Sequence, residues 1–150
     1  MPQVKSHENS TEITLQTEKI SLTLNKLQNS IKWFNNQKCF AEDIPSDAYV
    51  QQTNRVQHYM KFNQNDSFYG LGETPGQLCK NEERITLNPK DCLGYNAEKS
   101  NPLYKHFPWL ICHNPAQNYT YGILYDNFSE TVFDLGKEVD AMQGARYRYY

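Results

Sequence analysis

The sequence predicts an all-β protein built as an antiparallel β-sandwich. Polar and apolar residues alternate in its first half, and no window longer than about ten residues has a helical period. Pro and Gly separate short, evenly spaced apolar segments, as is typical of sandwiches. At 150 residues the chain has the size of one domain, so we expect a single domain over 1–150.

The strands of the first half follow from this alternation. In the segment 11–27, "TEITLQTEKISLTLNKL", isoleucines and leucines alternate with threonine, serine and charged residues. A period of two predicts two half-buried antiparallel strands. The segments 30–36 and 56–62 have the same character, and we expect the residues between them, 36–47, to form a loop.

The second half contains further strand-like segments. They lie at 83–87, 106–112, 119–126, 130–135 and 145–150. Tyr121, Ile123 and Tyr125 fall on one face of their segment, which predicts a core strand. Because the chain ends inside a strand-like segment, we expect it to be a fragment with an incomplete sandwich.

Charge and hydropathy restrict the partners. The 15 basic and 17 acidic residues give a net charge of −2, and no basic run is present, which argues against a nucleic-acid partner. The apolar stretch 107–112 is far shorter than the roughly 20 residues of a membrane helix. The polar start, 1–12, lacks the apolar core of a secretion signal. We therefore expect no membrane partner and a cytoplasmic location.

The four cysteines favour free thiols over metal ligands. Metal knuckles place two ligands within a few residues of each other, and no two cysteines lie that close. Free structural thiols are the preferred interpretation, with disulfides and metal binding as alternatives. We expect no metal and no cofactor. The cysteines are Cys39, Cys79, Cys92 and Cys112.

Asparagine followed at the second position by Ser or Thr occurs four times. In a chain this rich in asparagine such sequences arise by chance, so they do not argue for secretion. They begin at Asn9, Asn65, Asn118 and Asn127.

Five motifs follow one another between residues 68 and 136. They are a "YGLGE" turn at 69–73, "DCLGY" at 91–95, "LYKHFPW" at 103–109, "YGILYDN" at 121–127 and "FDLG" at 133–136. In this order they resemble the N-terminal β-sandwich domain of glycoside hydrolase family 31, whose best-known members are α-glucosidases. The resemblance implies a sandwich of the galactose-mutarotase-like type, the supersandwich.

The glycines of the first motif have a structural interpretation. Gly70 and Gly72 permit positive φ or close backbone approach where the chain leaves a strand. Glu73 is expected to seal this turn by accepting backbone N–H groups, with a direct ligand role as the alternative. His106 has no second histidine at metal spacing, so we expect a satisfied or surface histidine.

Asp91 is the best candidate for a substrate contact. It lies in a loop between Pro89 and Gly94, where a carboxylate serves no strand ladder or helix terminus. The resemblance implies that this aspartate hydrogen-bonds sugar hydroxyls near the bond being cut. The alternative is an Asx-type turn residue. Asn96 and Glu98 in the same loop are weaker candidates.

Catalytic residues are not expected in this chain. Retaining hydrolysis of a glycoside needs two carboxyl groups about 5 to 5.5 Å apart. The resemblance places both on a (β/α)8 barrel that follows the sandwich, and the chain has neither the barrel's alternating pattern nor its "W-x-D-M" motif. A pair formed by Asp126 and Asp134 is not favoured, because both fall in motifs that predict strand ends.

We therefore hypothesise a noncatalytic domain of a retaining α-glucosidase. The chain alone is expected to be inactive, and the full-length enzyme is expected to hydrolyse terminal α-linked glucose. The implied partners are an α-glucoside oligosaccharide, reached through the full-length enzyme, and the chain's own barrel. Unpaired sheet edges predict self-association as well.

Two other functions stay open. The first is a mutarotase-type enzyme, which needs a general acid and base positioned together. Its candidate residues are His58, His106, Glu73 and Glu98. The second is a stand-alone carbohydrate-binding module based on exposed tyrosines, whose rings suit stacking on sugars.

Overall fold

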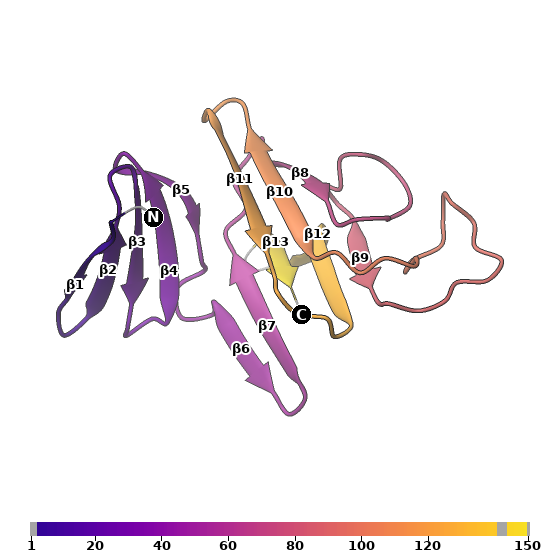
Figure 1. Cartoon of the computed structure of the whole chain (residues 1–150), viewed down its shortest axis with the longest axis horizontal. Coiled ribbons are helices and arrows are strands. Elements are labelled where there is room, and N and C mark those ends of the chain that lie inside the picture. The colour runs from indigo at the N-terminus through magenta and orange to yellow at the C-terminus, as the bar shows by residue number, and fades with distance from the viewer. Residues whose placement is uncertain (1–2, 141–143, 150) are drawn as a thin grey trace. The chain divides into compact units, whose positions relative to one another are not determined.

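The computed structural model describes the backbone of residues 3–140 and 144–149 and the side chains of residues 3–137. Within these residues the structure has thirteen strands and no helix, and every strand pair whose register is described below is antiparallel. The all-β prediction is therefore confirmed. The chain divides into two compact units, Met1–Lys61 and Phe62–Tyr150 (Figure 1). The prediction of one domain over 1–150 stays a prediction.

The first unit begins with a five-stranded meander in which each strand pairs with the next. Its strands are β1 (Lys5–Glu8), β2 (Glu12–Gln16), β3 (Ile20–Asn25), β4 (Ser30–Asn35) and β5 (Lys38–Glu42). Leu15 pairs with Leu22, which in turn pairs with Trp33. These three residues fall on the same side of the sheet because facing residues of antiparallel strands share a face. The alternating pattern in 11–27 thus gives the two strands that it predicts.

The expected loop at 36–47 is wrong, because its first half forms β5. Asn36 and Gln37 connect β4 to β5 and have φ values of 46° and 68°. Two consecutive residues with positive φ are typical of the type I′ turn of a tight hairpin. The usual sequence signal for that turn is Asn-Gly, and Gln37 in the glycine position concealed it.

A hairpin of β6 (Tyr49–Gln52) and β7 (Arg55–Met60) completes the first unit. The buried carboxylate of Asp43 accepts hydrogen bonds from the Ile31 amide at 2.8 Å and from the ring of His58 at 2.9 Å. Tyr49 stacks on His58 with ring centroids 4.6 Å apart. These contacts tie the hairpin to the end of the meander, so His58 has a structural role.

The second unit contains two groups of paired strands. The first has the order β11-β10-β8, with β8 (Ser67–Gly70), β10 (Trp109–Asn114) and β11 (Tyr119–Leu124). In the second, β12 (Thr131–Asp140) lies between β9 (Arg84–Leu87) and β13 (Gly144–Tyr149). The rings of Tyr125, just beyond β11, and Phe133 on β12 are 5.6 Å apart and connect the two groups.

The core of the second unit comes from alternate positions of these strands. Its buried apolar side chains are Phe68, Leu71, Ile85, Leu87, Leu110, Cys112, Phe133 and Leu135. The face formed by Tyr121, Ile123 and Tyr125 is half-buried, while the residues between them are exposed. The prediction that this face points inward is confirmed. The strand-like segment at 145–150 corresponds to β13, but Tyr150 lies outside the described residues.

The strand predicted at 106–112 begins three residues later than expected. The Trp109 amide donates to the carbonyl of Phe107 at 2.8 Å, which makes a tight turn over Pro108. Proline has no N–H to give to a sheet ladder, so pairing starts only at Trp109. His106 and Phe107 therefore belong to the loop before β10.

Candidate functional site

The long loop between β9 and β10 is the most prominent irregular segment of the second unit. It spans residues 88–108 and extends away from the strands (Figure 1). Loops longer than about 12 to 15 residues without secondary structure are uncommon, and many of them are functional. All three predicted substrate-binding residues lie in it.

The loop is anchored to β9 at its base. The side chain of Asn101 donates to the Arg84 carbonyl at 3.2 Å and accepts from the Thr86 amide at 3.0 Å. An amide side chain that offers one donor and one acceptor in this way imitates a neighbouring strand. Asn101 thus holds the outgoing limb of the loop against the edge of β9.

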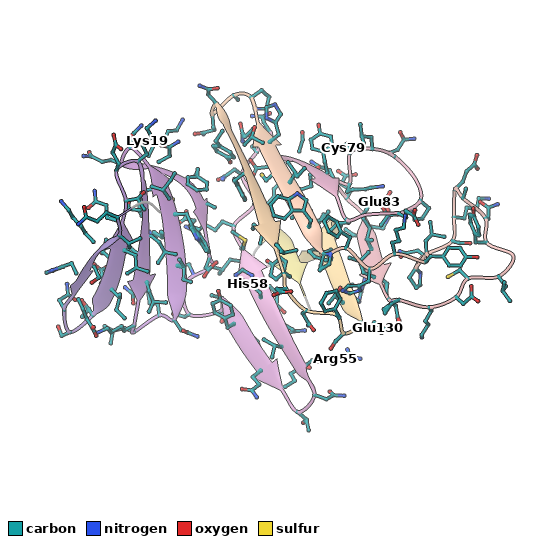
Figure 2. The ribbon with its side chains drawn as sticks, viewed as in Figure 1. Lys19, Arg55, His58, Cys79, Glu83 and Glu130 are labelled. Carbon is teal, nitrogen blue, oxygen red and sulfur yellow. The ribbon has the colours of Figure 1, made fainter. Side chains whose placement is uncertain are left out.

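Glu130 contacts the incoming limb. It lies directly before β12, labelled in Figure 2, and accepts a hydrogen bond from the side chain of Asn88. Glu130 also lies 4.0 Å from the Lys90 ammonium, and the side chains of Glu130 and Lys90 are largely exposed. An exposed pair of this kind contributes little stability, so the bond to Asn88 is the stronger of the two contacts.

The two limbs of the loop also bond to each other. The hydroxyl of Tyr104 donates to the backbone carbonyl of Cys92 at 3.0 Å. The thiol of Cys92 donates to the carbonyl of Pro102 at 3.1 Å. The rings of Tyr95 and Tyr104 meet edge to face with centroids 5.6 Å apart. The region around Asp91 and Cys92 is therefore held in a defined shape although it is exposed.

Asp91 has an available carboxylate. It is exposed, and among the described residues it forms no hydrogen bond and no ion pair. The alternative role as an Asx-turn residue has no support, because no backbone N–H within the described part of the chain donates to its side chain. Desolvation, and then the negative charge of Asp91, raise the pKa of the nearby Tyr104 hydroxyl.

Asn96 and Glu98 differ from Asp91 in how their side chains are used. The side-chain oxygen of Asn96 accepts from the Glu98 amide at 2.9 Å. The Asn96 backbone amide donates to the Ser100 hydroxyl, and the Ser100 backbone amide donates to the Asn96 carbonyl. Asn96 is therefore a turn residue. The carboxylate of Glu98 is exposed.

The "YGLGE" turn lies next to the end of this loop. Gly70, Leu71 and Gly72 have φ values of 100°, 64° and 67°. A Cβ on Gly70 would lie 2.5 Å from the Trp109 carbonyl oxygen, so only glycine fits there. The role predicted for Glu73 is wrong: its carboxylate pairs with the Lys105 ammonium at 2.7 Å instead of accepting backbone N–H groups.

The remaining titratable candidates have structural partners or lie apart. The ring of His106 bonds through Nε2 to the Asn127 carbonyl at 2.8 Å, but its Nδ1 is buried without a hydrogen-bond partner among the described residues, so the prediction of a satisfied histidine holds for only one of the two ring nitrogens. Asp134 is buried on β12 and accepts from the Lys137 amide, whereas Asp126 is exposed in the loop after β11. No bonded histidine–glutamate pair exists among the residues whose side chains are described.

Lys80 is a buried charged residue that the sequence did not reveal. It is only 5% exposed, and its ammonium donates to the Pro75 carbonyl at 3.0 Å. Burial lowers the pKa of Lys80, and the nearby charge of Glu83 offsets part of this effect. Nothing in its local sequence, "QLCKNEE", distinguishes it from a surface lysine.

The described residues hold neither a metal-binding cluster nor a membrane-spanning helix. Within the part of the chain that the structure describes, no three His, Cys, Asp or Glu side chains gather closely enough to hold a metal ion. The described residues also include no helix that is long and apolar enough to cross a membrane. The four cysteines are free thiols, as predicted.

Several known proteins similar to this chain are glycoside hydrolases. α-Glucosidase 2 of Bacillus thermoamyloliquefaciens is 27% identical over 150 residues, which cover 96% of this chain and 19% of that protein. A family 31 dextranase of Flavobacterium johnsoniae, solved with glucose, is 24% identical with a TM-score of 0.80, over 97% of this chain and 17% of the dextranase.

A more distant structure has the same fold. The family 31 α-xylosidase of Xanthomonas citri is 16% identical, with a TM-score of 0.64 over 95% of this chain and 16% of its own. The chain thus spans less than a fifth of the length of each of these three relatives. The two structural matches show the fold.

The family itself follows from the sequence. Residues 2–134 match the family model described as the glycosyl hydrolase 31 N-terminal galactose mutarotase-like domain. This segment includes the motifs at 69–73, 91–95, 103–109 and 121–127. The chain belongs to the family of N-terminal galactose mutarotase-like domains of glycoside hydrolase family 31.

Proposed function

We propose that this chain is the noncatalytic N-terminal domain of an α-glucosidase and that its loop at 88–108 contacts the sugar through Asp91. The observation that carries the proposal is the exposed carboxylate of Asp91, held on a loop that is bonded at its base and between its limbs. Family membership supplies the context, and the relative named α-glucosidase 2 supplies the activity.

The chemistry of Asp91 suits a sugar hydroxyl. An ionised carboxylate is a strong acceptor for O–H donors, and a bond to an ionised group is about twice as strong as a neutral one. Asp91 has this capacity unused within the described residues, whereas the side-chain oxygen of Asn96 serves its own turn. Glu98 is a second exposed carboxylate and a weaker candidate.

Bond cleavage is assigned to the rest of the enzyme. A retaining mechanism requires two carboxyl groups about 5 to 5.5 Å apart on either side of the bond. Asp134 is fully buried on its strand and Asp126 is exposed, so these two carboxyl groups do not share one open pocket. In the proposal, a (β/α)8 barrel of the full-length protein supplies both catalytic groups and packs against this domain.

The test replaces Asp91 in the full-length enzyme. Asp91→Asn keeps the size of the side chain and removes its charge, so KM for maltose should rise about ten-fold or more because a charge-assisted hydrogen bond is lost. Asp47→Asn, at an exposed aspartate of the first unit, is the matched control and should keep the wild-type KM. An unchanged KM in Asp91→Asn would remove Asp91 from the substrate site.

A stand-alone carbohydrate-binding module is the second candidate. It is favoured by the exposure of the Tyr95 and Tyr104 rings, at 51% and 42%. Calorimetry with maltose and isomaltose on the 150-residue chain separates the two functions. Micromolar binding by the chain alone would favour the module, and we expect weak binding or none.

A further inference from the structure

Tyr104 is bonded to the backbone carbonyl of Cys92, the residue that directly follows Asp91. Its hydroxyl donates to the Cys92 carbonyl at 3.0 Å, and Cys92 in turn donates through its thiol to the Pro102 carbonyl. Both bonds join the two limbs of the loop, and each limb supplies the donor of one bond. The backbone that carries Asp91 is therefore fixed from the far limb, while the Asp91 side chain itself forms no bond within the described part of the chain.

This restraint acts close to a glycine. Gly94, two residues beyond Cys92, has a φ of 73°, and no atom lies within 4 Å of the place that a Cβ would occupy. Glycine has the largest conformational freedom of any residue. Without a bond across the loop, the segment 91–95 would have to be ordered each time a ligand binds, at a cost in affinity.

The neighbouring tyrosine provides an internal comparison. Tyr95 contacts the ring of Tyr104 edge to face, and it is exposed to a similar degree. Among the described residues, however, the Tyr95 hydroxyl forms no hydrogen bond. The two phenols thus share their surroundings and differ in the one bond to the Cys92 carbonyl.

Asn101 completes the restraint at the base of the loop. Asn101 lies three residues before Tyr104, and its side chain bonds to the Arg84 carbonyl and to the Thr86 amide. The limb that carries Tyr104 is therefore itself fixed to a strand. A rigid support of this kind is what a bond from Tyr104 needs in order to hold the other limb in place.

We propose that Tyr104 is a positioning residue that holds the Asp91 backbone in its binding conformation through the hydrogen bond to the Cys92 carbonyl. The inference rests on the proposed function of Asp91. The benefit of the bond is pre-organisation: the loop is ordered before the sugar arrives, so less conformational entropy is lost on binding. Tyr104 need not touch the sugar to have this effect.

The experiment compares Tyr104→Phe with Tyr95→Phe. Each variant removes one hydroxyl and keeps the ring contact. In the 150-residue chain, the ¹⁵N order parameters of Cys92 and Leu93 should fall from about 0.85 to below 0.6 in Tyr104→Phe only. Unchanged order parameters in Tyr104→Phe would overturn the inference.

Kinetics of the full-length enzyme provide the second readout. Tyr104→Phe should raise KM for maltose about five-fold, the factor expected for one typical hydrogen bond, with kcat and the thermal midpoint unchanged. A purely structural role would lower the thermal midpoint instead, and that result would also overturn the inference. Tyr95→Phe should keep the wild-type KM.

The same experiment separates the inference from the proposed function. Asp91→Asn is measured alongside the tyrosine variants. If Tyr104→Phe loosens the loop while Asp91→Asn keeps the wild-type KM, the proposed role of Asp91 is wrong and the restraint by Tyr104 stands. If Asp91→Asn raises KM while Tyr104→Phe leaves order parameters and KM unchanged, Asp91 keeps its role and the inference about Tyr104 is wrong.

Discussion

Asn114 donates a hydrogen bond from its side-chain nitrogen to the carboxylate of Asp66 at 2.7 Å, and both side chains are buried. The same carboxylate accepts from the Tyr119 hydroxyl at 2.6 Å and from the Asn63 amide at 3.0 Å. Three donors thus satisfy one buried charge. This arrangement joins the start of β8 to the facing ends of β10 and β11.

Replacing Asp66 by alanine is predicted to destabilise the protein. The change leaves the half-buried Tyr119 hydroxyl without its acceptor and removes the closest acceptor of the buried Asn114 amide, and breaking a buried charged network costs roughly 3 to 5 kcal/mol. Urea unfolding monitored by circular dichroism measures the loss. Asp47→Ala, at an exposed position, should change stability by less than about 0.5 kcal/mol. An equal loss in both variants would contradict the role of the network.

Gly70→Ala should be far more harmful than Gly76→Ala. Both glycines have positive φ, at 100° and 83°, but only at Gly70 would the new Cβ collide with backbone, 2.5 Å from the Trp109 carbonyl oxygen. We expect a loss of roughly 3 kcal/mol or more at Gly70 and about 1 kcal/mol at Gly76. Thermal unfolding of the two variants would show similar midpoints if the collision were not important.

Stability is predicted to fall between about pH 9 and pH 12. Burial raises the pKa of Cys112 from 9.0 to about 12. Burial, and then the charge of Asp43, raise the pKa of Tyr49 from 10.0 to about 12. Each group keeps its proton longer in the folded state than in the unfolded state, so its contribution is complete below the unfolded pKa and is lost as the pH rises through the folded pKa.

This alkaline loss can be assigned to particular groups. Urea unfolding at several pH values gives the slope of stability against pH. Cys112→Ala and Tyr49→Phe should each flatten that slope above pH 9, whatever they do to stability at neutral pH. A slope that stays the same in both variants would mean that other groups dominate.

The four free thiols should react with Ellman's reagent at different rates. Cys39 is exposed, whereas Cys112 has no exposed surface. Burial raises the pKa of both thiols, so neither is activated, and access decides their order of reaction. Cys39→Ser should remove the fastest phase, and Cys112→Ala should remove a phase seen only after unfolding. Rapid modification of Cys112 in the folded protein would contradict its burial.

The local sequence predicts the strands because each needs one apolar face. Ile13 and Leu15 pair with Leu24 and Leu22, so these four side chains share one face, and a one-residue slip of the register would turn one strand's pair to the other face. The sequence fails where a turn uses an unusual residue, as at Gln37, or where a proline delays pairing, as at Pro108. In both places, the backbone conformation of one or two residues causes the difference between the predicted and the observed strand.

The candidate site was predictable in part. Asp91 could be selected from its place in a motif and in a polar loop; it is exposed, and its contact with a sugar stays a prediction. The contacts of Tyr104 and Asn101 could not be predicted, because they join residues more than ten positions apart along an irregular loop. The buried charges of Asp66 and Lys80 were missed for a similar reason: only the folded chain shows which polar residues are enclosed.

The most direct test of the account is a hydrolysis assay of the 150-residue chain beside the full-length enzyme, with 4-nitrophenyl α-glucoside and maltose as substrates. Under the proposed function, turnover is expected from the full-length enzyme and none from the chain alone, because the two catalytic carboxyl groups are assigned to the barrel. Measurable hydrolysis by the isolated chain would contradict the noncatalytic assignment.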